Sequence, residues 1–246
     1  MSKDIILIIG ASSDIGLNLI KNISDEALII AHYNSSNGKL LELSENINNE
    51  LVTLKADLSK EDEINKLLDT VESDYGIPNK IVHLAAVRVE NIRFKDVEWN
   101  DFEKDINVTL KSAILILNRF LPKLSKLKRG KVVLMLSSYV LGVPPKALSH
   151  YITIKYAMLG LVKSLASEYS DKNIQINGIS PSMVETKFLD NINEKFIELS
   201  AYNHPLKRNA IVEDITPIIK ILISNESNYI NGVNIPITGG SIFWKF

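Results

Sequence analysis

Short runs of apolar, mostly β-branched residues recur along the chain, and segments of a different pattern separate them. The runs span residues 4–10, 27–33, 51–58, 80–87, 131–138, 174–180 and 232–238. Runs of this length and composition are typical of strands that are buried on both faces of a parallel sheet. The pattern therefore predicts about seven strands.

The segments between the runs repeat apolar residues every three or four positions, which is the spacing of one helix face. The predicted helices span 12–23, 36–48, 60–75, 101–127, 150–170 and 213–224. Ser59 is placed to cap the third helix and Pro122 to break the fourth, and about 30 irregular residues follow the sixth strand. Because strands alternate with helices, we expect a single α/β domain over residues 1–246. It would be a Rossmann-type, doubly wound parallel sheet with helices on both faces.

Composition and charge narrow the possible functions. Hydrophobic residues make up 46% of the chain, which is enough for a buried core, and the net charge of −1 gives no electrostatic basis for binding nucleic acid or a membrane. No cysteine is present, and the four histidines at 32, 83, 150 and 204 lack the spacing of metal ligands. No segment is long enough for a signal peptide core or a membrane span, so we expect a cytoplasmic protein without a metal site.

The turn after the first predicted strand, residues 9–16, consists mainly of small residues. Small residues let the backbone approach a phosphate closely, and the helix that follows offers free N–H groups. A position after the first strand of an α/β chain favours a nucleotide site over a plain turn. The candidate contacts are Gly10, Ser12, Ser13, Asp14, Ile15 and Gly16. The charge of Asp14 would repel a pyrophosphate, so we expect this side chain to cap the helix and point away.

Two further strand ends could contact the nucleotide. Asp57, which precedes Leu58, could accept a hydrogen bond from an adenine amino group or could cap the following helix. The second strand ends at residues 32–36 without the acid that would bind a ribose 2′-hydroxyl and select NAD. Its polar residues could instead bind a 2′-phosphate, although no arginine is among them; they are His32, Asn34, Ser35 and Ser36. We therefore expect NADP(H) to be favoured over NAD(H).

Tyr151 and Lys155 stand four residues apart in a predicted helix and share one of its faces. A pair at this spacing is expected by chance about as often as it occurs, so the rest of the chain must support it. A phenol can donate a proton to a carbonyl oxygen, and a nearby cation lowers the phenol pKa. Ser138 ends the fifth predicted strand and can hydrogen-bond the same oxygen. His150 points to another side of the helix, and we interpret it as structural.

Taken in order, these residues resemble the short-chain dehydrogenase/reductase superfamily, especially its single-domain 3-oxoacyl-acyl-carrier-protein reductases. The matching segments are 9–16, 56–58, 83–86, 135–138, 151–155, 177–186 and 232–240. The resemblance implies NAD(P)H-dependent interconversion of a ketone and a secondary alcohol. It also implies a catalytic tetrad of Asn107, Ser138, Tyr151 and Lys155. Ser137 replaces Ser138 if the strand end is shifted by one residue.

The resemblance further implies cofactor contacts in the second half of the chain. Asn107 would hold a water that links Lys155 to solvent. The Val184 backbone and the Thr186 side chain would hold the nicotinamide carboxamide. The remaining contacts that it implies are Ala85, Ala86 and Pro181.

Several positions depart from the pattern of this superfamily. Ile9, Asp14 and Ser182 stand where Thr, Gly and Gly are usual, and residues 83–86 read His-Leu-Ala-Ala in place of Asn-Asn-Ala-Gly. These departures lie at positions that are expected to contact the cofactor, and the four residues of the tetrad are all present. Residues 83–86 look more like the sugar-nucleotide branch of the superfamily. The alternatives are therefore an enzyme acting on a sugar or polyketide intermediate, or a nucleotide-sensing protein without catalysis.

Partners are predicted from three further features. Residues 183–210 form the predicted substrate lid, whose apolar side chains suit an acyl substrate and simple packing equally well. Lys128, Arg129 and Lys172 resemble docking residues for an acidic acyl carrier protein, or they form a solvated helix end. The helices at 101–127 and 150–170 carry enough apolar residues for a second buried face, so we expect a homotetramer, with a homodimer as the alternative.

Overall fold

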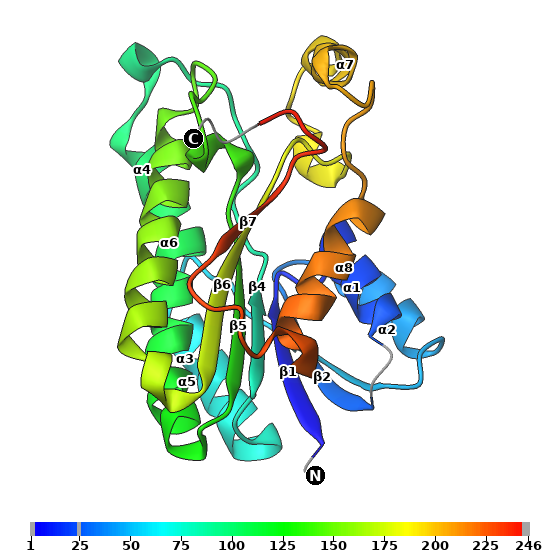
Figure 1. Cartoon of the computed structure of the whole chain (residues 1–246), viewed down its shortest axis with the longest axis vertical. Helices are drawn as coiled ribbons and strands as arrows, with labels where there is room; N and C mark the ends of the chain where they lie inside the picture. Colours follow the sequence, from blue (N-terminus) through cyan, green and yellow to red (C-terminus); the bar gives the residue numbers. More distant parts are fainter. Residues whose placement is uncertain (1–2, 24–25, 243–246) are drawn as a thin grey trace.

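The computed structural model contains one parallel sheet with the strand order β3-β2-β1-β4-β5-β6-β7 (Figure 1). Its strands are β1 (Asp4–Ile9), β2 (Ala27–Tyr33), β3 (Glu50–Lys55), β4 (Lys80–His83), β5 (Gly130–Met135), β6 (Ile174–Pro181) and β7 (Asn234–Ile237). The structure describes residues 3–23 and 26–242. The strand order reverses between β1 and β4, which is where open α/β sheets bind ligands. The predicted doubly wound sheet is confirmed.

Helices cover both faces of this sheet. They are α1 (Asp14–Asn22), α2 (Gly38–Ser44), α3 (Glu61–Thr70), α4 (Trp99–Asp105), α5 (Ser112–Leu127), α6 (Ser149–Glu168), α7 (Glu194–Asn203) and α8 (Val212–Ile223). In Figure 1, α3, α5 and α6 lie on one side of the strands, and α1, α2 and α8 lie on the other. None of the helices in the described ranges is long and apolar enough to cross a membrane.

Alternating side chains of each strand build a separate core under each helical layer. Leu7 and Ile9 belong to the core that includes α5 and α6, whereas Ile6 and Ile8 belong to the core that includes α1 and α8. All four are at most 1% exposed. Burying such a side chain stabilises the fold by about 1.5–3 kcal/mol. This explains why the strands read as continuous apolar runs.

Two predicted helix signals were wrong. The third helix has Lys60 at its N-cap position, while the Ser59 hydroxyl donates to Asp57 Oδ1 at 2.7 Å. Pro122 lies inside α5 without ending it. Phe120, Leu121 and Leu124, which surround the proline, are buried against the sheet, and their packing holds the helix together across the missing hydrogen bond.

Several predicted boundaries also differ from the structure. The fourth strand ends at His83 and not at residue 87, because its neighbour β1 ends at Ile9, the partner of His83. The stretch after β6, predicted to be irregular, contains α7, whose N-cap Asn193 accepts a hydrogen bond from the Lys195 N–H at 3.0 Å. In Figure 1, α7 stands at the end of the molecule opposite the N-terminus.

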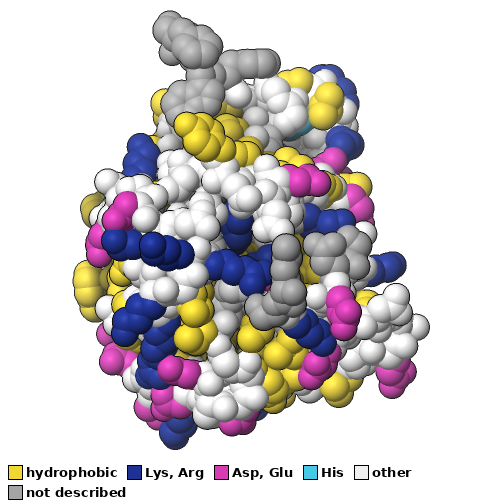
Figure 2. Space-filling model, turned by 60° about the horizontal axis from the view of Figure 1, so that its bottom comes forward, with side chains coloured by type: hydrophobic (Ala, Val, Ile, Leu, Met, Phe, Trp, Pro, Cys, Tyr) yellow, Lys and Arg dark blue, Asp and Glu magenta, His cyan; other side chains and the backbone are white. Residues whose placement is uncertain are grey.

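Charged side chains of both signs are interspersed on the face shown in Figure 2.

Candidate active site at the carboxyl edge of the sheet

A cavity of about 1410 Å³ opens at the carboxyl edge of the strands. This volume exceeds the roughly 300–1,000 Å³ of a typical single-ligand pocket, so the cavity has room for two molecules side by side. It extends from Gly10 after β1 to Tyr151 on α6 and Phe196 on α7. All of the site residues predicted from the sequence line it except Gly16 and Asn107.

The turn between β1 and α1 has the geometry that a phosphate site requires. Gly10 has φ +78°, and a Cβ on Gly16 would lie 2.5 Å from the Ala11 carbonyl oxygen, so both positions need glycine. Ser13 caps α1: its Oγ accepts from the Gly16 N–H at 3.1 Å and donates to the Gly10 carbonyl at 2.7 Å. The N–H groups of the first helical turn have no acceptor within the helix, so this turn fits a pyrophosphate.

Asp14 does not cap this helix, contrary to the prediction, because Ser13 already occupies the capping position. Its Oδ2 accepts a hydrogen bond from the Lys187 backbone N–H at 2.9 Å, and its Oδ1 lies 3.6 Å from Lys39 Nζ. The carboxylate is therefore directed toward the lid and a cation. Lys39 partly offsets the negative charge that Asp14 brings to the phosphate site.

His32 does not present its ring to a 2′-phosphate, and that part of the prediction was wrong. The side chain is buried; its Nδ1 accepts from the Gly10 N–H at 3.1 Å and its Nε2 donates to the Ala56 carbonyl at 3.0 Å. Burial lowers the pKa of His32, so the ring is neutral. Its hydrogen bond with the Gly10 N–H stabilises the glycine turn. Asn34, Ser35 and Ser36 do line the cavity, and Lys39 joins them there.

Asp57 forms a local turn at the end of β3. Its Oδ1 accepts from the Ser59 N–H at 3.0 Å and the Ser59 hydroxyl at 2.7 Å, and these bonds lower its pKa. Its own N–H donates to Glu63 Oε2 at 2.7 Å. Asp57 thus stabilises the start of α3. Asp57 and Leu58 also form part of the cavity wall.

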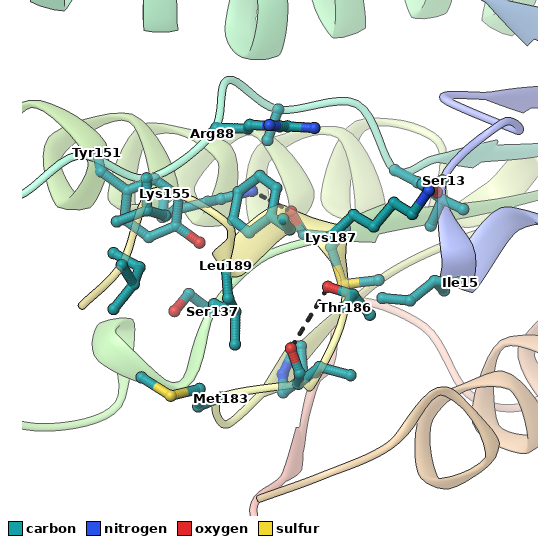
Figure 3. A pocket seen from close by; sticks show the side chains of 18 of the residues that line it. Ser13, Ile15, Arg88, Ser137, Tyr151, Lys155, Met183, Thr186, Lys187 and Leu189 are labelled. Carbon is teal, nitrogen blue, oxygen red and sulfur yellow. Dashed lines mark hydrogen bonds between the residues drawn. The ribbon is translucent and has the colours of Figure 1, made fainter. Parts of the chain in front are cut away.

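Tyr151 and Lys155 face the cavity from the first turns of α6 (Figure 3). Lys155 is only 2% exposed, and its Nζ donates to the Met135 carbonyl at 2.9 Å and lies 5.5 Å from the centre of the Tyr151 ring. Burial lowers the pKa of Lys155 to about 8. Burial also raises the pKa of Tyr151, so the predicted lowering was wrong for this arrangement. Tyr151 therefore carries its proton at neutral pH.

The two serines after β5 are not equivalent. The strand ends at Met135, and Ser137 is extended, whereas Ser138 begins a short 3-10 turn that ends at Val140. The Ser137 side chain opposes the rise of the Tyr151 pKa, and Figure 3 shows it on the same side of the cavity as the tyrosine ring. Both serines line the cavity, so either could hold the substrate oxygen beside Tyr151.

Asn107 lies in a π-helical turn, residues Ile106–Lys111, that separates α4 from α5. It is partly buried but does not line the cavity, and its backbone carbonyl accepts from the Ser112 N–H. Single π-helical turns are frequent at functional sites because they change the direction of side chains within a helix.

On the wall of the cavity that follows β6, Thr186 Oγ1 donates to the Val184 carbonyl at 3.4 Å (Figure 3).

Comparison with known proteins decides the family. A family model described as enoyl-(acyl carrier protein) reductase matches residues 10–241. The chain belongs to the short-chain dehydrogenase/reductase superfamily. It is 27% identical to the 3-oxoacyl-[acyl-carrier-protein] reductase FabG of Buchnera aphidicola subsp. Baizongia pistaciae over 242 residues, 97% of each protein. It is therefore an NAD(P)-dependent oxidoreductase.

Solved structures show the same fold. Levodione reductase superposes with a TM-score of 0.88 at 24% identity and 96% coverage of both chains. YwfH, described as an NADPH-dependent reductase involved in bacilysin biosynthesis, gives a TM-score of 0.89 at 19% identity, covering 99% of this chain and 100% of that one. At these identities the likeness supports the fold of this dehydrogenase/reductase and not its substrate.

The structure adds cavity-lining residues to this dehydrogenase/reductase that sequence reasoning missed. Lys39 follows β2 by a few positions and could have been found by extending the search beyond residue 36. Arg88 also lines the cavity and lies 3.6 Å from Asp190 of the lid, an ion pair between residues far apart in the chain. No local pattern signals such a contact. The lid is thus joined to the body of the domain through Arg88 and through Asp14.

Proposed function

We propose that this protein is an NADPH-dependent reductase that converts a ketone to a secondary alcohol and that prefers 3-oxoacyl thioesters. The observation that carries this proposal is the convergence of Ser137, Tyr151 and Lys155 on one wall of a cavity whose other end is the Gly10 turn. A proton donor, a hydrogen-bond donor and a buried cation next to a dinucleotide site are what carbonyl reduction requires.

Each side chain has a separate task in the proposed reaction. Tyr151, protonated at neutral pH, donates its phenolic proton to the carbonyl oxygen as negative charge develops there. Ser137 holds the same oxygen with a hydrogen bond and so stabilises that charge. Lys155 favours the phenolate that remains after proton transfer and can reach the ribose hydroxyls of the nicotinamide. NADPH, when bound, supplies the hydride.

The lid supports a substrate with an apolar tail. Its cavity-facing side chains are mainly hydrophobic: Met183, Phe188, Leu189, Ile192, Phe196 and Leu199. An acyl chain bound among them would remove apolar surface from water, at about 25 cal/mol per Å². The 27% identity to a 3-oxoacyl-[acyl-carrier-protein] reductase supports the same substrate class.

The preference for NADPH rests on the adenosine end of the cavity. Ser35 and Ser36 offer hydroxyl groups there, and Lys39 supplies a cation. A 2′-phosphate carries charge that an ammonium group binds strongly, whereas a ribose 2′-hydroxyl gains little from the same cation. Binding of this phosphate would draw Lys39 away from Asp14.

Lys39→Gln tests this preference. We expect the KM for NADPH to rise about tenfold, because one charge-assisted contact with the 2′-phosphate is lost, while the KM for NADH stays the same. Initial-rate kinetics with both cofactors measure the effect. Lys21→Gln, an exposed lysine on α1, is the matched control. Equal changes for the two cofactors would exclude Lys39 as the 2′-phosphate contact.

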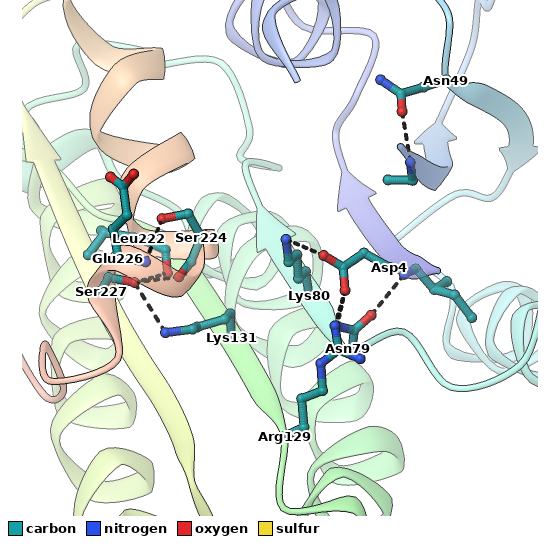
Figure 4. Close-up of polar contacts among 12 residues, drawn as sticks. Asp4, Asn49, Asn79, Lys80, Arg129, Lys131, Leu222, Ser224, Glu226 and Ser227 are labelled. Carbon is teal, nitrogen blue, oxygen red and sulfur yellow. Dashed lines mark hydrogen bonds and ion pairs between the residues drawn. The ribbon is translucent and has the colours of Figure 1, made fainter. Parts of the chain in front are cut away.

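Lys128, Arg129 and Lys172 precede β5 and β6 at the amino end of the sheet, opposite the cavity. Arg129 pairs there with Asp4, which also binds Lys80 at 2.6 Å (Figure 4). Since Tyr151 lies in the first turn of α6 and Lys172 follows the end of this helix at Glu168, the two sites are roughly 25–30 Å apart.

A carrier protein that docks at this amino end would therefore serve the cavity of another copy of the chain. We propose a homotetramer that brings the two ends together. Its contacts would form through α5 and α6, whose outer faces expose Ile114, Leu127 and Tyr156.

A substrate panel tests the proposed function. Oxidation of NADPH is followed with acetoacetyl thioesters, simple ketones, keto sugars and the unsaturated crotonyl thioester. We expect turnover to be fastest with acetoacetyl thioesters. Reduction of crotonyl thioester alone would favour an enoyl reductase, which the description of the matching family model suggests. Cofactor binding without turnover of any substrate would favour a nucleotide sensor.

A further inference from the structure

Two loop segments meet at the end of the cavity that holds Tyr151. One segment follows β4 and the other leads into α6, and the Ile92 N–H of the first donates to the Ala147 carbonyl of the second at 2.9 Å. Val89 of the first segment is buried in one cluster with Leu148 and Tyr151. The two segments therefore form the wall of the cavity beside the proposed proton donor.

Each segment contributes one cation to this wall. Arg93 follows Ile92 and Lys146 precedes Ala147, so the hydrogen bond between the segments keeps the two cations near each other. Both residues line the cavity and are exposed. Within residues 3–23 and 26–242, neither side chain forms an ion pair or a hydrogen bond. Both positive charges are therefore available to a ligand.

The acids in the neighbourhood lie away from this wall. Glu90 and Asp96 flank Arg93 in the chain, but neither of them lines the cavity. Among the described residues, the acids that do line it are Asp14 and Asp57, which follow β1 and β3 at the nucleotide end. A negatively charged group on a ligand would thus be attracted to this wall without repulsion from a carboxylate beside it.

Two further cations of the cavity belong to a different part of it. Arg88 lies 3.6 Å from Asp190 of the lid. In the view of Figure 3, Arg88 and Lys187 lie between Tyr151 and Ser13, which is toward the nucleotide end. The phosphates of the cofactor are proposed to bind at that end. The wall formed by the two loop segments is therefore separate from the cofactor site.

The backbone at Ala147 fixes the loop that carries Lys146. Ala147 has φ +66°, in the left-handed region that residues with a Cβ seldom adopt. Its carbonyl is held by the Ile92 N–H, and the next residue, Leu148, is buried. A loop that is fixed before the ligand arrives loses less conformational freedom on binding.

We propose that Arg93 and Lys146 form an anion subsite that binds a phosphate group of the substrate, at a point remote from the carbonyl that is reduced. A phosphate monoester carries a charge of about −1.5 to −2 at pH 7, which two cations match. Arginine offers a planar set of donors to the phosphate oxygens, and Asn91, which also lines the cavity, can add an amide donor.

The distance between the subsite and the proton donor limits the length of the substrate. The five residue steps from Lys146 to Tyr151 span at most about 18 Å. A phosphorylated thioester arm that carries a 3-oxoacyl group has its phosphate and its ketone in one extended molecule, and so has the phosphate of a keto sugar. The subsite deepens the proposed function and rests on it for its place in turnover.

Two pairs of substrates that differ by a phosphate test the subsite and separate these two sources. The first pair is acetoacetyl phosphopantetheine and acetoacetyl pantetheine, and the second is fructose 6-phosphate and fructose, each assayed with NADPH. In one of the pairs we expect kcat/KM to be about tenfold higher for the phosphorylated member, because charge-assisted contacts are added. In the double variant Arg93→Gln/Lys146→Gln, the ratio within that pair should fall close to one.

Lys95→Gln is the matched control. Lys95 is an exposed cation two positions after Arg93, and it does not line the cavity. We expect this variant to keep the preference of the unmodified protein. A preference for phosphate in neither pair would overturn the proposal, and so would a preference that survives in the double variant.

Binding without turnover separates this proposal from the proposed function. Phosphopantetheine and fructose 6-phosphate are titrated by calorimetry into the protein with NADP⁺, each against its unphosphorylated counterpart. We expect one phosphorylated compound to bind about tenfold more tightly than its counterpart, and the double variant to lose the difference. Tighter binding without turnover of any ketone would support the subsite while the proposed function fails. Equal binding within both pairs would overturn the subsite even if ketones are reduced.

Discussion

Tyr151→Phe should reduce kcat for ketone reduction about 10³-fold, because the substitution removes the proton donor and little else. The tyrosine side chain is buried in a cluster with Val89 and Leu148, and phenylalanine fills nearly the same volume. Binding of NADPH should stay close to that of the unmodified protein, since the glycine turn lies at the other end of the cavity. Single-turnover kinetics and cofactor fluorescence measure the two quantities separately.

Loss of cofactor binding in Tyr151→Phe would point to a structural defect and not to a missing proton donor. Lys155→Met tests the same proton-transfer step with a second variant. It should also lower kcat, because the phenolate left after proton transfer would lose its neighbouring cation. A kcat that is unchanged in Tyr151→Phe would sink the proposed mechanism.

Ser137→Ala should lower kcat/KM about 100-fold, whereas Ser138→Ala should stay close to the unmodified protein. The Ser137 side chain lies on the same side of the cavity as the Tyr151 ring, so its loss removes a hydrogen bond that forms where charge develops. Ser138 begins the following 3-10 turn and serves as the matched control, being the same residue type at the adjacent position. Initial rates with acetoacetyl thioesters measure both variants.

The opposite result would restore the assignment made from spacing along the chain. A large loss in Ser138→Ala, with Ser137→Ala unaffected, would mean that the strand end shifts when substrate binds. Equal losses in both would mean that the turn acts as a unit. Only the first pattern, a loss confined to Ser137→Ala, supports the direct contact with the carbonyl oxygen.

Local patterns predicted the parts of this site that depend on neighbouring residues in the chain. Gly10 and Gly16 were recognised because a phosphate at a turn between a strand and a helix needs close approach of the backbone, and the structure shows that neither position accommodates a side chain. Tyr151 and Lys155 were expected to be neighbours because residues four positions apart lie on the same face of a helix. Local spacing was enough to place these residues, whereas the catalytic interpretation of Tyr151 and Lys155 needed support from the rest of the chain.

Contacts between distant segments could not be predicted in the same way. Asp14 was expected to cap its own helix, but it accepts a hydrogen bond from Lys187, 173 residues away. Ser137 and Ser138 both line the cavity, because β5 ends at Met135 and leaves both serines after the strand. His150 was interpreted as structural because it points to another side of the helix, and its partner, Asp105, is 45 residues distant in the chain.

The sequence by itself determined the doubly wound sheet, the nucleotide turn and the Tyr151–Lys155 pair, because each follows from the periodicity of strands and helices and from steric limits on the backbone. Only the tertiary structure decided the protonation of those groups. Burial depends on what packs around a side chain, and it raises the pKa of Tyr151 and lowers that of Lys155 to about 8.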